Sequence, residues 1–310
     1  KPVTKSILAS LTLGTGCLSI SASAGTLDLA NNALEVVSGV EPNIFVLTDD
    51  SGSMDYEVLM NIFDEGRFFL PNNDDSNSAR YHYIFPAVSG GGEHTYDTNS
   101  NNGRTLPSEE SILDEFSLTA DGHGVWRARY HGTNAVYYNP DITYIPWKGV
   151  KDNGTTTYSD APITAAPYDP YLASGTATID LTTTLPDYTA QSVPDPSGSS
   201  SDEDITVSGY FPARYYTWTD TDTDGVVDAD DAHTRVEIKP AASGGSDSYV
   251  RKVYDENTNE GRSDCGADGD GDGLVTCSYG QEIQNFANWF SYYRQREYAA
   301  KASLSLVIEE

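Results

Sequence analysis

The chain has 310 residues, with 47 acidic side chains against 18 basic ones and a formal net charge of −29. A phosphate backbone is bound through clustered Lys and Arg, so this balance excludes nucleic acid as a partner and disfavours an anionic membrane surface. The length is enough for one large domain or two smaller ones with real cores. Cations are the natural partners of such a chain, and its aspartates are clustered.

The first 24 residues have the features of an export signal. Two lysines precede an apolar run over residues 7–20, and residues 22–24 (Ala-Ser-Ala) form a small-residue cleavage site. We expect cleavage rather than lipid attachment at Cys17, because Leu13 lies one position too far away for a lipobox. No later segment has the roughly 20 consecutive apolar residues that a membrane helix requires.

A continuous apolar run over Asn43–Thr48 predicts a strand buried on both faces. It ends at Asp49, and Ser51 and Ser53 follow at alternate positions. One carboxylate and two hydroxyls so spaced can face a single Mg²⁺ or Ca²⁺ ion. The pattern is short and also occurs in ordinary polar turns. Its place at the C-terminal end of a strand, where α/β sheets keep their sites, favours a metal site.

From there to about residue 279 the chain is rich in Tyr, Thr, Asp, Ser, Gly and Pro, with short strand-like runs between turn residues. This composition predicts a long region that is mostly β-strand and loop. The predicted strands are Thr176–Leu181, Ile205–Phe211, Ala213–Trp218, Thr234–Lys239 and Tyr249–Tyr254.

The sharpest motif is a 12-residue loop of the EF-hand type that begins at Asp220. Ca²⁺ prefers six to eight hard oxygens, which alternating side chains supply while Gly225 at position 6 permits the bend. Crowded carboxylates repel one another without a cation, which favours binding over a merely solvated acidic turn. The expected ligands are the side chains of Asp220, Asp222, Asp224, Asp228 and Asp231 and the carbonyl of Val226.

A second loop, which begins at Asp268, repeats the pattern with Gly273 at position 6. Position 12 is Tyr279, which has no carboxylate, so we expect Glu282 to reach in instead. A glycine-rich connector is the alternative interpretation. The expected Ca²⁺ ligands are the side chains of Asp268, Asp270, Asp272 and Thr276 and the carbonyl of Leu274.

Removal of the signal leaves two cysteines, Cys265 and Cys277, which bracket the second loop. In an oxidising compartment an isolated pair so close in sequence predicts a disulfide. Closing a loop of about 13 residues stabilises the fold by roughly 3 kcal/mol in the chain-entropy model.

An amphipathic helix is predicted from about residue 280 to residue 308, beginning with a capping box formed by Ser278 and Gln281. Apolar side chains then recur at helical spacing, and the basic ones lie off this stripe. The stripe consists of Phe286, Phe290, Tyr293, Ala300, Leu304 and Val307, and the basic residues are Arg294, Arg296 and Lys301.

Several segments resemble a known family. Residues 44–54 (IFVLTDDSGSM) are similar to the first strand and metal-ion-dependent adhesion site of a von Willebrand factor A domain. Residues 282–296 (EIQNFANWFSYYRQR) resemble the first helix of that domain in the PilY family of type IV pilus tip proteins. Residues 126–130 (WRARY) and 137–147 (YYNPDITYIPW) resemble the family's long insertion between strand and helix.

By this resemblance the fold is α/β, an incomplete von Willebrand A-like, Rossmann-type domain with a large β-rich, loop-rich insertion between its first strand and first helix. Residues 1–24 would be the signal peptide, 25–54 the strand and metal-site loop, 55–279 the insertion and 280–310 the helix. Asp49, Ser51 and Ser53 carry over as adhesion-site ligands. The Thr and Asp that complete such a site, and the family's C-terminal β-propeller, would follow residue 310, so we expect an N-terminal fragment.

The resemblance implies cation-dependent adhesion and type IV pilus biogenesis at the pilus tip or outer surface of a Gram-negative bacterium. Minor pilins and host or surface ligands would be the partners. A secreted, calcium-stabilised hydrolase is one alternative, but the chain has no H-E-x-x-H or G-x-S-x-G motif. A carbohydrate-binding protein that uses Trp126, Trp147 and Trp218 is another, although such aromatic residues also form cores. We therefore expect a binding protein rather than an enzyme.

Overall fold

The computed structural model describes residue 49 and residues 51–60, 68–70, 79–86, 104–106, 125–193, 203–227 and 231–309. The chain divides into two compact units, residues 1–48 and 49–310, and everything described belongs to the second unit. The signal peptide and the strand predicted over Asn43–Thr48 lie outside the described residues.

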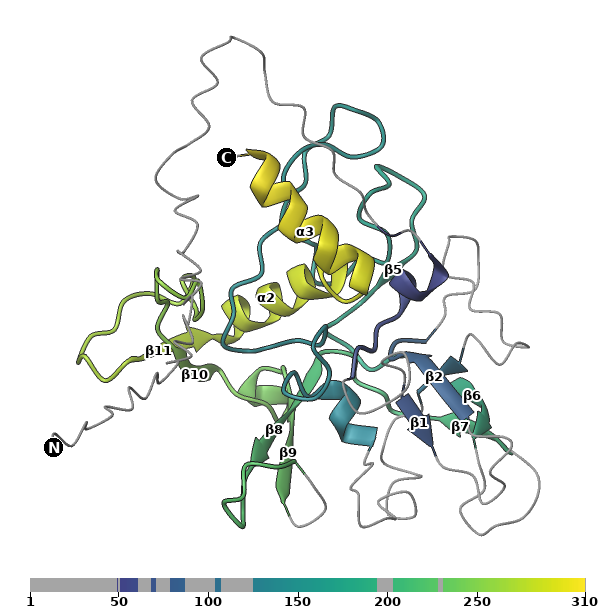
Figure 1. The fold of residues 1–310 in the computed structure, drawn as a ribbon, viewed down its shortest axis with the longest axis horizontal. Helices are drawn as coiled ribbons and strands as arrows, with labels where there is room; N and C mark the ends of the chain where they lie inside the picture. Colours follow the sequence, from purple (N-terminus) through teal and green to yellow (C-terminus); the bar gives the residue numbers. More distant parts are fainter. Residues whose placement is uncertain are drawn as a thin grey trace, which may run out of the picture. The chain divides into compact units, whose positions relative to one another are not determined.

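The described residues form short strands, short 3₁₀-helices (η) and two α-helices (Figure 1). In chain order they are η1 (Gly52–Asp55), β1 (Phe68–Leu70), β2 (Ala79–Tyr83), β3 (Arg104–Thr105), η4 (Val125–Arg129), β4 (Ala166–Pro167), β5 (Thr178–Ile179), β6 (Tyr188–Val193), β7 (Glu203–Val207), β8 (Arg214–Thr219), β9 (Ala232–Glu237), η5 (Ala241–Ser243), β10 (Ser248–Lys252), β11 (Leu274–Ser278), α2 (Tyr279–Tyr292) and α3 (Arg296–Glu309).

The strands pair mainly with their neighbours in sequence. β1, β2 and β3 form a three-stranded sheet, and the pairs β4–β5, β6–β7, β8–β9 and β10–β11 are each antiparallel and two-stranded. The described part of the chain is therefore mixed α and β, and within it there is no doubly wound parallel sheet of the Rossmann type. Each of the five strands predicted from the sequence overlaps an observed one, namely β5, β7, β8, β9 and β10.

Helix α2 begins where the sequence predicts. The Ser278 side chain accepts a hydrogen bond from the backbone N–H of Gln281 (3.3 Å), and the Gln281 side chain accepts one from the backbone N–H of Ser278 (2.8 Å). This capping box satisfies two donors that a helix start otherwise leaves unpaired. Ten of the 14 residues of α2 are buried, so the helix is covered on all sides rather than along one stripe.

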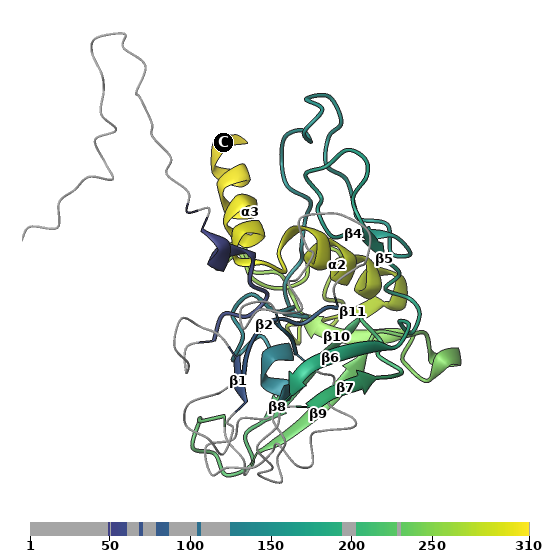
Figure 2. The ribbon, with the colours of Figure 1, turned by 90° about the vertical axis from the view of Figure 1, so that its right-hand side faces the viewer.

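Asparagine side chains of α2 hold a long irregular segment against the helix. Asn285 accepts a hydrogen bond from the backbone N–H of Tyr144 (2.7 Å) and donates one to the carbonyl of Ile142 (2.8 Å). Asn288 likewise accepts from the N–H of Ala161 (2.9 Å) and donates to the carbonyl of Tyr144 (3.0 Å). Buried backbone groups require partners, and here side-chain amides supply those that a neighbouring strand would give. Figures 1 and 2 show this segment, drawn in teal, passing beside α2.

The single helix expected over residues 280–308 is wrong, because the chain breaks between α2 and α3. An Arg294 guanidinium N–H donates to the carbonyl of Phe290 (2.8 Å), the group that in an uninterrupted helix accepts the backbone N–H four residues later. The backbone N–H of Arg296 donates instead to the carbonyl of Tyr56 (3.2 Å). These tertiary contacts shift the phase of α3, so that Tyr298 and Ala302 are buried while Val307 is 71 % exposed.

Arg294, expected on the polar side of the helix, is fully buried in an ion pair with Glu57. The Nε of Arg294 lies 3.0 Å from the Oε1 of Glu57. The second oxygen of Glu57 accepts hydrogen bonds from the backbone N–H groups of Ile84 (2.7 Å) and Phe85 (3.0 Å). The guanidinium also donates to the carbonyl of Tyr168 (2.7 Å). Every charge in this cluster is hydrogen-bonded, which is the condition under which a buried pair is tolerated.

We predict that Arg294→Met lowers the free energy of unfolding by about 3–5 kcal/mol, because it leaves the Glu57 carboxylate buried without its cation. Urea denaturation would measure the loss. The matched control is Lys252→Met, which removes a 3.7 Å pair with Asp141 from a lysine whose side chain is 74 % exposed and should cost less than about 1 kcal/mol. Equal urea midpoints of unfolding for the two variants would contradict the prediction.

Candidate metal centre

The first aspartate loop follows β8 at the tip of the β8–β9 hairpin. Asp220, Asp222 and Asp224 each place a carboxylate oxygen within 4.8 Å of those of the other two. Two oxygens on opposite sides of a Ca²⁺ ion, each at about 2.4 Å, lie about 4.8 Å apart. The spacing of these three carboxylates therefore suits one such ion.

Backbone groups hold this first loop in a defined conformation. The position-1 carboxylate, Asp220, accepts hydrogen bonds from the N–H groups of Thr223 (2.6 Å) and Gly225 (3.0 Å), at positions 4 and 6. Both donors have left-handed backbones, with φ of 67° and 76°. The carboxylates at positions 3 and 5 each accept the N–H two residues further on, at 3.2 and 2.7 Å.

The second loop has the same arrangement. Asp268 accepts the N–H groups of Gly271 (2.7 Å) and Gly273 (2.9 Å), again at positions 4 and 6, with φ of 79° and 81°. The carboxylates at positions 3 and 5 also each accept a hydrogen bond from the backbone N–H two residues further on, at 3.4 and 2.9 Å. The carboxylate oxygens of Asp268, Asp270 and Asp272 also lie within 4.8 Å of one another. Two segments far apart in the sequence thus hold three carboxylates in the same arrangement.

The backbone N–H donors of the second loop also lower the pKa of Asp268. The pKa of Asp268 lies below its ordinary value because its carboxylate accepts hydrogen bonds from the N–H groups of Gly273 and Gly271. Hydrogen bonds to the charged form of a carboxylate favour that form. The Asp268 carboxylate is therefore ionised at neutral pH, which is the state that a cation requires.

The expected position-12 ligands are placed differently from a complete EF-hand loop. The Asp231 carboxylate accepts hydrogen bonds from the indole Nε1–H of Trp218 (2.7 Å) and the N–H of Thr221 (2.8 Å), and so closes the base of the first loop. Asp228 lies outside the described residues. Glu282 is fully buried and bound by arginines, so the expectation that it completes the second loop is not met.

The remaining predicted ligands of the two loops lie at their exits. Val226 and Leu274, both at position 7, are exposed, and each donates its N–H to the position-5 carboxylate before it. Thr276 lies on the exposed side of β11, opposite Val250 of β10. The structure therefore brings the three aspartates of each loop together, and Val226 and Leu274 stay bound to them through their backbone N–H groups.

Asp49, Ser51 and Ser53 lie together at the start of η1. The Asp49 carboxylate accepts the N–H of Ser51 (2.9 Å), and the hydroxyls of Ser51 and Ser53 hydrogen-bond to each other (3.1 Å). The pKa of Asp49 is lowered, first by the hydrogen bond from the backbone of Ser51 and second by the one from the Ser51 side chain. One carboxylate and two hydroxyls therefore share one exposed turn, as the alternate spacing predicts.

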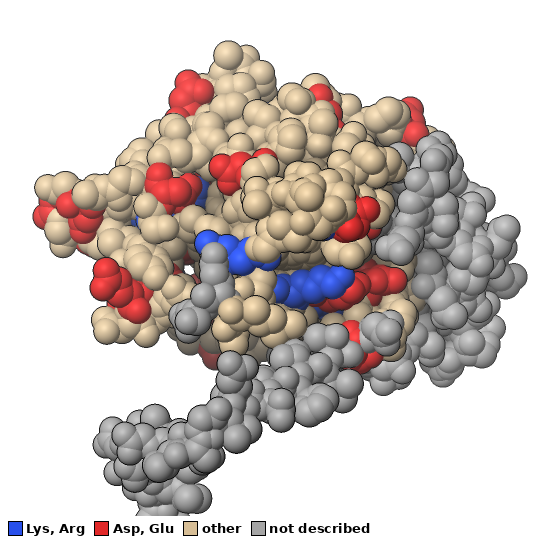
Figure 3. Space-filling model, turned by 90° about the horizontal axis from the view of Figure 1, so that it is seen from above, with Lys and Arg blue, Asp and Glu red and all other residues tan. Residues whose placement is uncertain are grey.

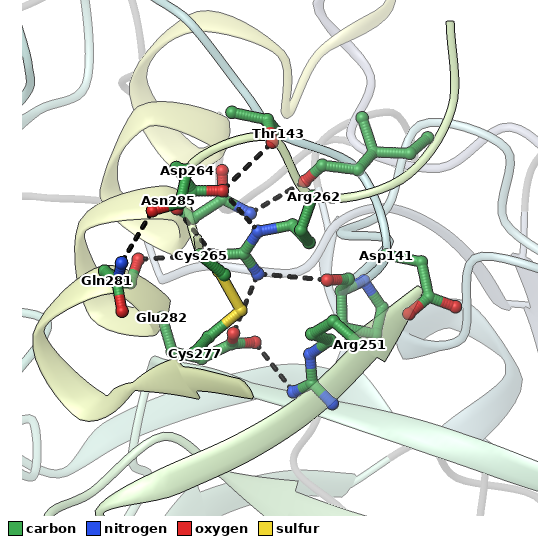
Figure 4. Close-up of polar contacts among 12 residues, drawn as sticks. Asp141, Thr143, Arg251, Arg262, Asp264, Cys265, Cys277, Gln281, Glu282 and Asn285 are labelled. Carbon is green, nitrogen blue, oxygen red and sulfur yellow. Dashed lines mark hydrogen bonds and ion pairs between the residues drawn. A yellow bond between two sulfur atoms is a disulfide. The ribbon is translucent and has the colours of Figure 1, made fainter. Parts of the chain in front are cut away.

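The predicted disulfide between Cys265 and Cys277 is present, and it closes the second loop at its base. Beside it, Arg262 donates two hydrogen bonds to the Asp264 carboxylate, at 2.8 and 2.9 Å (Figure 4). The side chain of Gln281, at the start of α2, donates to the carbonyl of Asp264 (2.6 Å). The second loop is thus fixed to α2 through both of its ends.

The carboxylate of Glu282, which we expected to complete the second loop, is instead buried at this junction. Glu282 accepts hydrogen bonds from Arg251 (2.8 Å) and Arg262 (2.8 Å), as Figure 4 shows. It also accepts one from the hydroxyl of Tyr138 (2.9 Å). Burial, and then the charge of Glu282, raises the pKa of Tyr138 well above its ordinary value, so its hydroxyl stays a donor. The local sequence gives no sign of this burial, because the two arginines that bind Glu282 come from other elements.

Acidic side chains on the surface are more widely spread than basic ones (Figure 3). Figure 3 shows Asp and Glu in several separate groups across one face, with Lys and Arg confined to fewer places. Of the three tryptophans considered for sugar binding, Trp126 and Trp147 are 6 % and 5 % exposed, while Trp218 is half-buried. Trp126 stacks on His233 with ring centroids 4.6 Å apart. The aromatic residues thus contribute mainly to packing.

Comparisons of the chain with family models, with curated proteins and with solved structures find no match. Neither α2 nor α3, the two α-helices of the described residues, has the length and apolar character needed to cross a bilayer.

We predict that Cys265→Ser/Cys277→Ser lowers the free energy of unfolding by about 3 kcal/mol, because the open chain regains the entropy of a loop of about 13 residues. Urea unfolding in EDTA measures this effect apart from any ion. The second measurement is calcium titration: if the loops bind Ca²⁺, the affinity should fall at the Asp268 loop and stay unchanged at the Asp220 loop, whose strands the disulfide does not join. Equal weakening at both loops would contradict a local role for the disulfide.

Proposed function

We propose that this protein is a cation-dependent adhesion and type IV pilus biogenesis module that holds Ca²⁺ in its two aspartate loops. The observation that carries the calcium part is the shared geometry of these loops. In both, three carboxylates converge within 4.8 Å, and the position-1 aspartate is held by the N–H groups of positions 4 and 6.

The residues of the loops suit a hard divalent cation. Aspartate oxygens are the ligands that Ca²⁺ takes, and its flexible coordination tolerates loops of unequal completeness. A bound ion would supply positive charge that offsets the repulsion among three carboxylates. Carbonyls and water would supply the further oxygens that three aspartates leave open. We propose a binding role rather than a catalytic one.

The two loops would have different effects on the fold. The Asp220 loop is the tip of a hairpin, so an ion there orders β8 and β9 at their outer end. The Asp268 loop leads through β11 directly into α2, and its base is joined to Arg262, Asp264 and the disulfide. An ion in this second loop would therefore stabilise the junction on which α2 depends.

The adhesion part rests on the resemblance of residues 44–54 and 282–296 to the PilY family. Asp49, Ser51 and Ser53 would hold Mg²⁺ or Ca²⁺ there, with open positions for an acidic group of a partner. The disulfide supports a location in an oxidising compartment, in keeping with export to the pilus tip or outer cell surface. Minor pilins and surface ligands are the proposed partners.

We expect Ca²⁺ to raise the thermal stability of the purified protein and EDTA to reverse the effect. At about 100 times the dissociation constant, each site linked to global unfolding adds about 2.7 kcal/mol. In calorimetric titration, the variants Asp220→Asn and Asp268→Asn should each lose one Ca²⁺-binding event or bind Ca²⁺ roughly tenfold more weakly at the altered loop. The reason is that the number of charged ligands sets Ca²⁺ affinity.

The matched control for these variants is Glu256→Gln, which removes a charge from an exposed residue outside both loops. It should bind Ca²⁺ as the unaltered protein does. If all three variants weaken binding alike, diffuse surface charge rather than the loops attracts the ion. If the unaltered protein shows neither heat of binding nor a shift in melting temperature, the calcium proposal fails.

The adhesion proposal has its own test, because it uses a different site. Beads coated with the protein should retain purified minor pilins of the source bacterium in Mg²⁺ or Ca²⁺, and release them in EDTA. Ser51→Ala/Ser53→Ala should abolish retention and leave both aspartate loops able to bind Ca²⁺. Retention that is unaffected by this variant would contradict the proposed role of the Asp49 site.

A further inference from the structure

A cavity of about 520 Å³ lies between α3 and the long irregular region, which lines it with residues 147–150, Tyr158 and Tyr171. Its volume falls within the range of roughly 300–1,000 Å³ that is usual for small-molecule sites. No residue of the aspartate loops lines it. The cavity is therefore independent of the calcium proposal.

The walls of this cavity are apolar and mainly aromatic. Trp147 and Tyr158 meet edge to face, with ring centroids 5.5 Å apart, and Tyr171 is 48 % exposed. Leu304 and Ile308 of α3 form the opposite side. Rigid rings and aliphatic side chains of this kind favour a flat or chain-like apolar group, which gains by leaving water.

Two lysines line the cavity, in a chain that is strongly acidic, although Asp169 and Asp152 lie close enough to add to the effect of burial in raising the pKa of the lining residue Tyr158. Lys301 lies 5.6 Å from the ring centroid of Trp147 and 5.9 Å from that of Tyr171, and Lys148 also lines the cavity. Neither Asp nor Glu is among the described lining residues, although the whole chain has 47 of them. Glu297 pairs with Lys301 at 2.6 Å, but an ammonium has three donors and this side chain is 42 % exposed.

We propose that this cavity binds a small amphipathic anion, an apolar chain or ring that ends in a carboxylate. The apolar body would lie against Trp147, Tyr171 and Leu304, and the carboxylate would meet the ammonium groups of Lys301 and Lys148. A neutral analogue would keep only the apolar contacts. A cationic analogue would be opposed by both lysines.

The test is calorimetric titration of the full chain with three ligands of equal chain length, decanoate, decanol and decyltrimethylammonium. Decanoate should bind roughly tenfold more tightly than decanol, and decyltrimethylammonium should not bind. Lys301→Met keeps the apolar stem and should reduce the preference for decanoate to about twofold or less. Leu304→Trp places a larger ring in one wall of the cavity and should weaken binding of both decanoate and decanol.

Two controls keep the outcome clear. Lys252→Met removes an exposed lysine that does not line the cavity and should leave decanoate binding unchanged. Melting curves of each variant establish that it is folded, and Lys301→Met alone decides the question if Leu304→Trp is not. Equal binding of decanoate and decanol, or decanoate binding as tight in folded Leu304→Trp as in the unaltered protein, would overturn the proposal. So would self-association that Leu304→Trp abolishes without any ligand binding, since a second copy of the chain would then fill the cavity.

Discussion

The arrangement of the described residues depends on one buried carboxylate, that of Glu282. It lies in the first turn of α2 and forms ion pairs with Arg251 of β10 and with Arg262, which precedes the second aspartate loop. It also accepts a hydrogen bond from the hydroxyl of Tyr138 in the long irregular segment. A buried carboxylate is very costly without such partners, so three separate parts of the chain must meet at one point. The Glu57–Arg294 pair performs the same task at the other end of the helix.

Among the described residues, burial removes more basic than acidic side chains from the surface, since the buried acidic ones are Glu57, Asp169 and Glu282. Five arginines, Arg127, Arg129, Arg214, Arg262 and Arg294, are buried, out of only 18 basic residues in the whole chain. The positive charge that remains to balance the exposed aspartates is correspondingly small. A surface of this kind attracts divalent cations over the whole molecule, and the two ordered loops are where carboxylates are already close enough to bind one ion.

Local features were predictable from the sequence, and distant ones were not. The capping box, the disulfide, the five strands and the grouping of each aspartate triplet depend on residues a few positions apart, where turn chemistry decides the outcome. Arg294 and Glu57 are 237 positions apart, and nothing in the local pattern reveals that a basic residue will turn inward and interrupt the helix. Glu282 was misplaced for the same reason, since its two arginines come from other elements.

The Cys265–Cys277 bond has a consequence for how the molecule responds to extracellular proteases. The second aspartate loop is exposed and rich in glycine, and such loops are preferred sites of cleavage. A cut between Cys265 and Cys277 severs the backbone but leaves the two fragments covalently joined through sulfur. The segment that ends in α2 and α3 would therefore remain attached to the rest of the protein after the loop itself had been nicked.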